Sequence, residues 1–280
     1  MLSGSMSTPD RPKIPKEELD HIPGTERSTR IDVWWWLVVL VVGITILLLF
    51  AWPDPFMNIF KFVQDGIVIT VTVTLVSFLL VLIVGMIGGL GRLSNKRPVY
   101  VISTLYVELV RGVPLLVQLI IWYFAVPVMI QSLGKAWNLP SLENFQADPV
   151  VMAIIGLVFC YGAYMSEIYR AGIQSIPKGQ MEAARSLGMT YFQSMRHVVL
   201  PQAVRVILPP IGNEFIALLK DSSLVSVVAV ADLTRRGREY ASIHFDPIEV
   251  WMLVALLYLI MTLFSARVVN WIEKKTKFER

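Results

Sequence analysis

The segment 176–201 reads IPKGQMEAARSLGMTYFQSMRHVVLP and lies between two strongly apolar stretches. Pro177 suits the first turn of a helix, where its missing N–H leaves no hydrogen bond unmade. Most residues of 180–187 favour helices, and Glu182 lies near the positively polarised helix start. Gly188 suits a left-handed helix end. A short, mostly polar helix between apolar segments has little of its own chain to pack on, so we predict a docking element for a partner protein.

The composition indicates a membrane protein. The chain has 280 residues, of which 55% are hydrophobic and 16% charged, whereas soluble domains have about 45–50% and about 25%. This difference excludes an ordinary soluble enzyme. The single cysteine, Cys160, excludes an intrachain disulfide, and the three histidines lack the spacing of metal ligands. We therefore predict an all-α integral membrane protein without a metal site, and we attribute the net charge of +4 to basic loops, not to nucleic-acid binding.

The apolar stretches predict about six membrane spans. A helix needs about 20 mostly apolar residues to cross the membrane. The segment 198–233 is too long, because a single helix of that length would extend about 54 Å. It also contains the polar run Lys220-Asp221-Ser222-Ser223, so we predict a broken span there. The predicted spans are 33–52, 66–90, 99–130, 150–171, 198–233 (broken) and 248–269.

The distribution of Lys and Arg predicts the orientation. Most of these residues fall in segments that are cytoplasmic if both the N- and the C-terminus are cytoplasmic. Residues 1–32, rich in proline and charge, then form a disordered cytoplasmic tail, and 273–280 form a second tail. A secretory signal at the first span is disfavoured, because its apolar core is too long and no small-residue cleavage site follows. The basic cluster 235–238 contradicts the trend, and the sequence gives no reason for it.

The polar loop resembles a known signature. Glu182-Ala183-Ala184 is followed after three residues by Gly188, and nine further residues precede the aliphatic run that ends in Leu200-Pro201. This pattern is similar to the EAA coupling motif in permease subunits of bacterial type I ABC importers. The flanks resemble the polar amino-acid uptake branch of this family. The likeness extends over 60–272, and its other characteristic stretches are 108–118, 164–172 and 213–224.

The resemblance implies a type I ABC importer permease fold, with a permease core over 60–272 and a coupling loop over 172–201. It also implies a multi-pass protein of the bacterial inner membrane, surrounded by lipid. Its partners would be a second permease copy, an ABC ATPase dimer and an extracytoplasmic amino-acid-binding protein. The chain has no Walker-type phosphate loop. ATP and Mg²⁺ therefore belong to the ATPase, and this chain is a transport subunit, not an enzyme, without a cofactor of its own.

Some questions of function stay open at this point. The sequence does not say which polar amino acid is carried, or whether the two permeases are identical. A secondary amino-acid transporter that works without ATP is the alternative function. Such transporters typically have internal repeats with broken helices in both halves, whereas this sequence has one predicted broken span and no detectable repeat. We therefore favour the importer.

The motif and the broken span give two sets of candidate site residues. For ATPase coupling these are Pro177, Glu182, Ala183, Ala184, Gly188, Leu200 and Pro201. In the broken span, a half-helix restarting at Ser222 would direct its positive end at a substrate carboxylate, and Glu214 would meet an ammonium group. Alternatively, Lys220 and Asp221 pair with each other and only shape the outer gate. The predicted path residues are Asn213, Glu214, Lys220, Asp221, Ser222 and Ser223.

Further pairs within the predicted spans carry structural expectations. Glu108 and Arg111 are three residues apart on one helix face, so we predict an ion pair with a structural or gating role. Glu167 and Arg170 repeat this spacing, and we expect a structural role there. The glycine pattern of 85–89 permits close helix contact, which we expect within this chain and not between two copies.

Overall fold

The computed structural model describes residues 33–276, and this part of the chain is helical and contains no β-strand. The predicted tail 1–32 lies outside the described residues. The predicted tail 273–280 begins inside the last helix, which continues to Thr276. The helices are α2 (Val33–Ala51), α3 (Pro53–Arg92), α4 (Arg97–Arg111), α5 (Leu115–Ile120), η1 (Ile121–Ala125), α6 (Val126–Ala136), α7 (Pro140–Glu143), α8 (Pro149–Gln174), α9 (Lys178–Ser186), α10 (Tyr191–Ser194), η2 (Met195–Val199), α11 (Leu200–Asp221), η3 (Ser222–Val228), α12 (Leu233–His244) and α13 (Pro247–Thr276).

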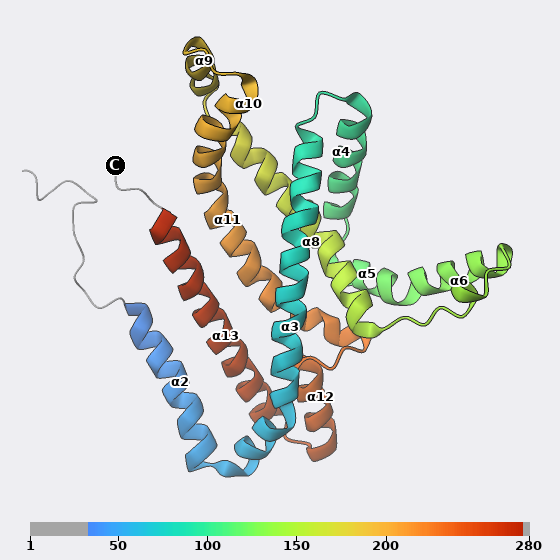
Figure 1. Ribbon diagram of the computed structural model, residues 1–280. Helices are drawn as coiled ribbons and strands as arrows, with labels where there is room; N and C mark the ends of the chain where they lie inside the picture. The colour runs from blue at the N-terminus through green and yellow to red at the C-terminus, as the bar shows by residue number, and fades with distance from the viewer. Residues whose placement is uncertain (1–32, 277–280) are drawn as a thin grey trace, which may run out of the picture.

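The long helices form a bundle in which α3 packs on α8, α8 on α11 and α11 on α13. Helices α9 and α10 project from one end of this bundle, and α12 lies at the opposite end (Figure 1). Helix α13 runs toward the end that carries α9 (Figure 1). The bundle thus separates two ends with different elements, one with the polar loop and one with the basic helix.

Four described helices are long and apolar enough to cross a membrane, which confirms the predicted multi-pass membrane architecture. A fifth apolar helix, Trp35–Ala51, is shorter. Helix α11 is not among the four, and it carries two consecutive prolines in its interior. The total of six spans stays a prediction. The four long helices are Pro53–Arg92, Leu115–Ala136, Pro149–Gln174 and Pro247–Thr276.

Helices α3 and α8 are in close contact along a glycine face. Gly85, Gly88 and Gly89 of α3 are all buried. A methyl group added at Gly89 would lie 2.8 Å from the carbonyl oxygen of Ser166 in α8, which is closer than side chains tolerate. Both helices belong to this chain, so the expected contact within one subunit is confirmed.

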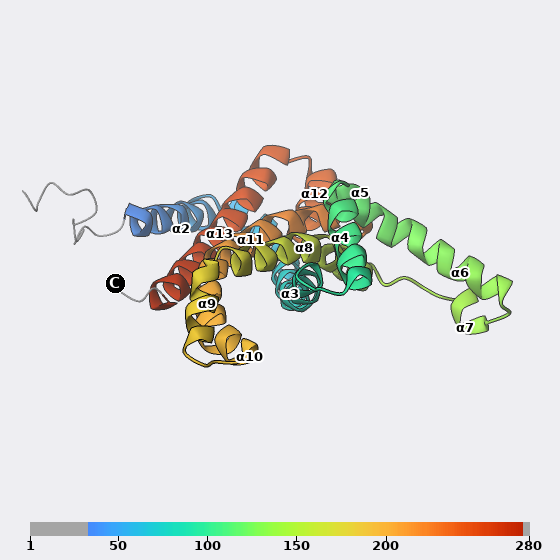
Figure 2. The same ribbon diagram turned by 90° about the horizontal axis from the view of Figure 1, so that it is seen from above.

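The predicted span 99–130 is wrong as a single continuous helix. Helix α4 ends at Arg111 and α5 begins at Leu115. Pro114 explains the break, because proline has no N–H to donate and disfavours the helical conformation in the residue before it. Beyond the break, α5 and α6 turn away from the bundle (Figures 1 and 2).

A side chain supplements the backbone hydrogen bonds at this break. The Nε2 group of the buried Gln118 donates to the carbonyl of Val110 at 2.9 Å and to that of Val113 at 2.8 Å. Unpaired carbonyl groups in a buried helix end are costly. Gln118 therefore makes a sharp break possible in a part of the chain that is otherwise apolar.

The predicted restart of a half-helix at Ser222 is also wrong. Helix α11 runs directly into the 3₁₀ turn η3, and the Ser222 hydroxyl donates to the carbonyl of Leu219 at 2.7 Å. This hydroxyl therefore bonds the preceding turn and does not cap a new helix. The actual break follows at Ala229, whose φ of +65° places it in the left-handed region.

The helix that follows the break has its own cap. The buried Asp232 accepts hydrogen bonds from the backbone N–H groups of Thr234 at 3.1 Å and Arg235 at 3.0 Å. An aspartate in this position satisfies the free donors of the first turn. Thr70 of α3 accepts a hydrogen bond from the N–H of Leu233 at 3.1 Å, which fixes the start of α12 against α3.

Candidate functional site

The predicted docking helix is present as α9, which begins at Lys178 directly after Pro177. Glu182 and Ala183 are exposed, and Ala184 is the buried residue of this helix. Because the helix begins at Lys178, Glu182 lies in its second turn. The helix dipole acts mainly in the first turn, so the position of Glu182 makes its carboxylate available to a partner more than it stabilises the helix start.

Gly188 ends α9 in the predicted left-handed conformation, with φ at +85°. Its N–H donates to the carbonyl of Arg185 at 3.0 Å, and the N–H of Met189 donates to that of Ala184 at 3.3 Å. These two bonds form a Schellman motif, which satisfies the last carbonyls of the helix. No atom lies within 4 Å of a methyl group added at Gly188. The requirement for glycine is therefore conformational and not steric.

Three apolar side chains around this turn face solvent. Leu187 is 83% exposed, Tyr191 62% and Phe192 70%. These residues are not among those predicted from the sequence, where the loop reads as mostly polar. The signal was the aromatic pair Tyr191-Phe192 directly after the helix end. Large apolar side chains that gather on a projecting element mark a protein contact surface. We call Leu187, Tyr191 and Phe192 the apolar tip.

Helix α9 is held against the start of α11. The Nε2 group of Gln202 donates to the Oε1 of Gln180 at 3.3 Å and to the carbonyl of Val198 at 2.8 Å. Leu200 and Pro201 form the first turn of α11 and are exposed. A displacement of α9 is thereby linked directly to the helix that carries the predicted path residues.

A second group of polar residues lies on α4, α8 and α11, where α8 packs against both of the other helices. Glu214 interacts electrostatically with Asp221 and with Arg111. The Tyr161 hydroxyl donates to the Oδ2 of Asp221 at 2.7 Å, and the Arg111 guanidinium lies 5.2 Å from the centre of the Tyr164 ring. We call these five residues the central cluster. It combines one cation with two carboxylates.

The central cluster contains only part of the predicted path. Asn213 and Lys220 are exposed on α11, Ser223 is half-buried, and Ser222 is fully buried. Asp221 is bound by a tyrosine, and within residues 33–276 no ion pair joins it to Lys220, so the alternative Lys220–Asp221 pair is not formed. Tyr161 and Tyr164 are not among the predicted path residues; their spacing of three residues places both on one face of α8.

The predicted ion pair between Glu108 and Arg111 is wrong. Glu108 instead pairs with Arg92 of α3 at 3.2 Å, and Arg92 also pairs with Glu167 of α8 at 2.7 Å. Arg170 bonds the same Glu167, in agreement with its expected structural role. The physical reason is tertiary: α3 brings a guanidinium between α4 and α8, and Arg111 lies over an aromatic ring. We call Arg92, Glu108, Glu167 and Arg170 the Arg92 network.

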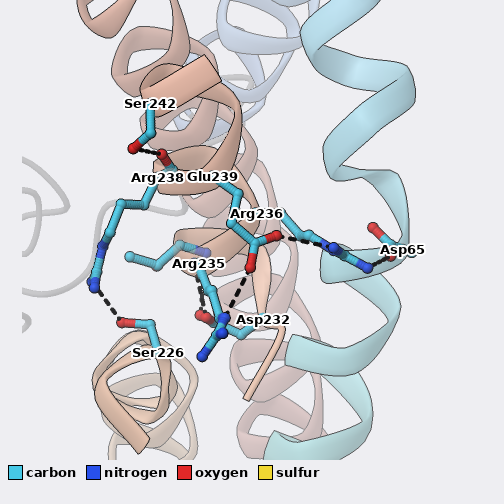
Figure 3. Close-up of polar contacts among 9 residues, drawn as sticks. Asp65, Ser226, Asp232, Arg235, Arg236, Arg238, Glu239 and Ser242 are labelled. Carbon is cyan, nitrogen blue, oxygen red and sulfur yellow. Dashed lines mark hydrogen bonds and ion pairs between the residues drawn. The ribbon is translucent and has the colours of Figure 1, made fainter. Parts of the chain in front are cut away.

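The structure explains most of the basic cluster on α12. Arg235 pairs with Glu239 at 2.9 Å, and Arg236 pairs with Glu239 at 2.9 Å and with Asp65 of α3 at 2.5 Å (Figure 3). The positive charges of these two arginines are therefore largely compensated by neighbouring carboxylates. No group of three or more metal-ligating side chains occurs in the described part of the chain.

Comparison with known proteins identifies the family of this chain. Residues 82–278 match the family described as "Binding-protein-dependent transport system inner membrane component". The chain is 36% identical over 216 residues to the probable glutamine ABC transporter permease protein GlnM of Bacillus subtilis (strain 168), covering 77% of this chain and 94% of the relative. It is 35% identical over 232 residues to the L-cystine transport system permease protein TcyB of the same organism, covering 80% and 93%.

Similar solved structures are also ABC transporters. The chain resembles a crystal structure of an amino acid ABC transporter with histidines, with a TM-score of 0.69 and 33% identity over 78% of this chain and 96% of the other. The MetNI methionine ABC transporter in an inward-facing conformation shares the fold, with a TM-score of 0.62 at 19% identity over 79% and 99%. The chain therefore belongs to the family of inner-membrane components of binding-protein-dependent transport systems, as a multi-pass protein of the inner membrane.

Proposed function

We propose that this chain is the permease subunit of an ATP-driven importer of polar amino acids, and that it couples to ATPase subunits through α9. The relatives named for glutamine and cystine transport support this proposal. Family membership disfavours the alternative of a secondary transporter, because the family is defined by dependence on a binding protein.

The charges of the central cluster are the observation that supports an amino acid as the substrate. An amino acid presents a carboxylate and an ammonium group a few ångströms apart. Arg111 supplies the cation that a carboxylate requires, and Glu214 and Asp221 supply anions for the ammonium group. In a partly desolvated site such charge pairs are stronger than in water. The substrate is therefore a zwitterion, and a polar side chain is accommodated by Asn213, Lys220 and Ser223.

The exposure of charged residues supports a second permease copy. Arg111 and Lys220 are exposed on the single subunit, although α4 and α11 run along the long apolar helices. Ionisable side chains that face lipid are costly, and in membrane proteins they face a protein interior or a water-filled cavity. A second permease, identical or different, covers this side and encloses a path between the two subunits.

Coupling follows from the position of the apolar tip. An ABC ATPase dimer binds α9 and the apolar tip on the cytoplasmic side, and both termini lie on that side. ATP and Mg²⁺ are bound by the ATPase. Closure of the ATPase dimer draws the two copies of α9 together, and the bond between Gln180 and Gln202 transmits this movement to α11. The path then opens outward, where an extracytoplasmic binding protein delivers the amino acid.

Reconstitution tests the proposal. The chain is co-purified with the ATPase encoded beside it, placed in proteoliposomes and supplied with the neighbouring binding protein and a panel of labelled amino acids. We expect uptake that requires both internal ATP and the binding protein. Uptake that follows a proton or sodium gradient without ATP would contradict the importer and favour the secondary transporter.

A further inference from the structure

One basic residue of α12 is not compensated within the described chain. Arg235 and Arg236 are paired with carboxylates, but Arg238 is exposed and forms no ion pair within residues 33–276. Its guanidinium donates to the Ser226 hydroxyl at 3.2 Å (Figure 3). A neutral hydroxyl is a weaker partner for a guanidinium than a carboxylate. Arg238 therefore retains the capacity to bind an anion.

Arg238 lines a cavity of about 480 Å³ between α12 and η3. The polar groups in its wall come from Ser226, Arg235, Arg238, Glu239 and Ser242, and its apolar rim comes from Val227 and Ile243, which are both exposed. The cavity is large enough for one or two side chains. Its wall thus offers a partner both polar groups and two exposed apolar side chains.

The neighbouring Glu239 does not neutralise this cavity. Its Oε1 accepts from the Nε of Arg235 and its Oε2 accepts from Arg236, both at 2.9 Å. The hydrogen bond from Arg235 holds the pKa of Glu239 below its ordinary value, so this carboxylate stays ionised and committed to its two partners. The cavity is therefore positively charged, because the charge of Arg238 is not balanced by Glu239.

The contact of Arg238 also has a mechanical consequence. Ser226 belongs to η3, which continues directly from α11 and begins one residue after Asp221 of the central cluster. The hydrogen bond between Arg238 and Ser226 therefore joins α12 to the segment that leads into the path.

From these observations we infer that the cavity at Arg238 receives an acidic side chain of the extracytoplasmic binding protein. The inference rests on the proposed function, because α12 faces outward only if α9, at the opposite end of the bundle, faces the ATPase (Figure 1). Charge complementarity identifies the partner group as a carboxylate of Asp or Glu.

The test uses the complete permease–ATPase complex in nanodiscs of neutral lipid. ATPase activity is measured against the concentration of substrate-loaded binding protein for wild type, Arg238→Ala, Arg238→Lys and Ser242→Ala. Ser242 lines the same cavity, but its hydroxyl donates to the Arg238 carbonyl in its own helix, so it is the matched control. ATPase activity without binding protein shows whether each complex is assembled.

We expect Arg238→Ala to raise the half-maximal concentration of binding protein about three- to tenfold, with unchanged activity in its absence. Arg238→Lys recovers most of the affinity, and Ser242→Ala behaves as wild type. Added salt weakens docking of the wild type more than that of Arg238→Ala, because one attractive charge pair is missing in the variant.

Two results would overturn the inference alone: an unchanged half-maximal concentration in Arg238→Ala, or cross-linking of Arg238→Cys to the second permease in the resting complex. If the wild type is stimulated by no binding protein at all, the proposed function itself fails.

Discussion

The guanidinium of Arg92 donates to Glu167 at 2.7 Å, across a separation of 75 residues in the sequence. This bond joins α3 to α8 near the end of the bundle from which α9 projects. The same guanidinium reaches Glu108 of α4 at 3.2 Å, so that one side chain connects three helices. The Arg92 network thus connects three helices through two ion pairs, and these pairs differ in burial.

Substitutions test how much each ion pair of Arg92 contributes to stability. The side chain of Arg92 is 11% exposed and that of Glu167 26%, whereas that of Glu108 is 65% exposed. Exposed ion pairs contribute little, so Glu108→Gln should change stability by less than about 0.5 kcal/mol. Arg92→Met leaves Glu167 with Arg170 alone and should cost about 1 kcal/mol or more. Thermal unfolding of the purified complexes measures the stability of both variants. Equal melting temperatures for Glu108→Gln and Arg92→Met would contradict the expected order.

The helix end at Gly188 should be essential for coupling. Gly188→Val forces a β-branched side chain into φ near +85°, at a cost of about 1–2 kcal/mol in the backbone of the turn. The expected variant inserts into the membrane but binds and stimulates its ATPase poorly. ATPase co-purification and ATP-dependent uptake measure this loss.

Gly179 provides the matched control for this substitution. Like Gly188, it has no atom within 4 Å of an added methyl group, but its φ lies outside the left-handed region. Gly179→Ala should therefore retain coupling. Normal uptake by Gly188→Val, or equal losses in both variants, would show that the conformation of the turn is unimportant.

The apolar tip should contribute to the ATPase contact and not to the stability of the permease. Phe192 is 70% exposed, so Phe192→Ser removes almost no packing within the subunit. Burial of a phenylalanine against a partner is worth about 1.5–3 kcal/mol, which predicts at least a tenfold weaker association with the ATPase. Binding of purified ATPase to the permease in nanodiscs measures the difference. An affinity like that of the wild type would remove the apolar tip from the interface.

The central cluster should determine substrate recognition. Glu214→Gln and Arg111→Met each remove one charge that a zwitterion requires, and we expect uptake to fall about tenfold or more, with ATPase docking intact. Uptake in proteoliposomes and ATPase co-purification separate the two effects. Ser222→Ala is the internal comparison, because this hydroxyl is buried and bonded to Leu219, and it should alter uptake little. Normal uptake by both charge variants would place the substrate elsewhere.

Gln118 should be important for stability at the break after α4. Gln118→Leu preserves the approximate volume but leaves the carbonyl of Val113 without its side-chain donor, at a cost of about 1–3 kcal/mol for an unpaired buried group, while the carbonyl of Val110 keeps the N–H of Val113 at 3.3 Å. Gln131→Leu is the control, since Gln131 of the projecting α6 is only half-buried and its Nε2 donates to the carbonyl of Phe145. Thermal unfolding should show a larger loss for Gln118→Leu, and the reverse order would refute this role.

The coupling helix and its end could be predicted from residues close to them in the sequence. Helix α9 and the left-handed Gly188 follow from the residues that flank them, because caps and turns depend on a few neighbouring positions. The glycine face of α3 was also predictable, since small residues at a spacing of four indicate close packing.

The remaining features depend on contacts that are distant in the sequence. Pro114 signalled the end of α4, but the surrounding apolar run favoured one continuous span. Asp232 is a typical helix cap, yet it lies at the end of a long apolar segment in which Ser222 seemed the better candidate. The partner of Glu108 is on another helix, so spacing along α4 alone did not identify it.

The amide of Gln118 has a consequence for how the path can change during transport. The break between α4 and α5 draws its hydrogen-bond donors from within the protein and not from solvent. The carbonyls at this bend therefore remain satisfied whether the neighbouring path is hydrated or dry. Arg111, the last residue of α4, is therefore carried by a helix end whose hydrogen bonds do not depend on water.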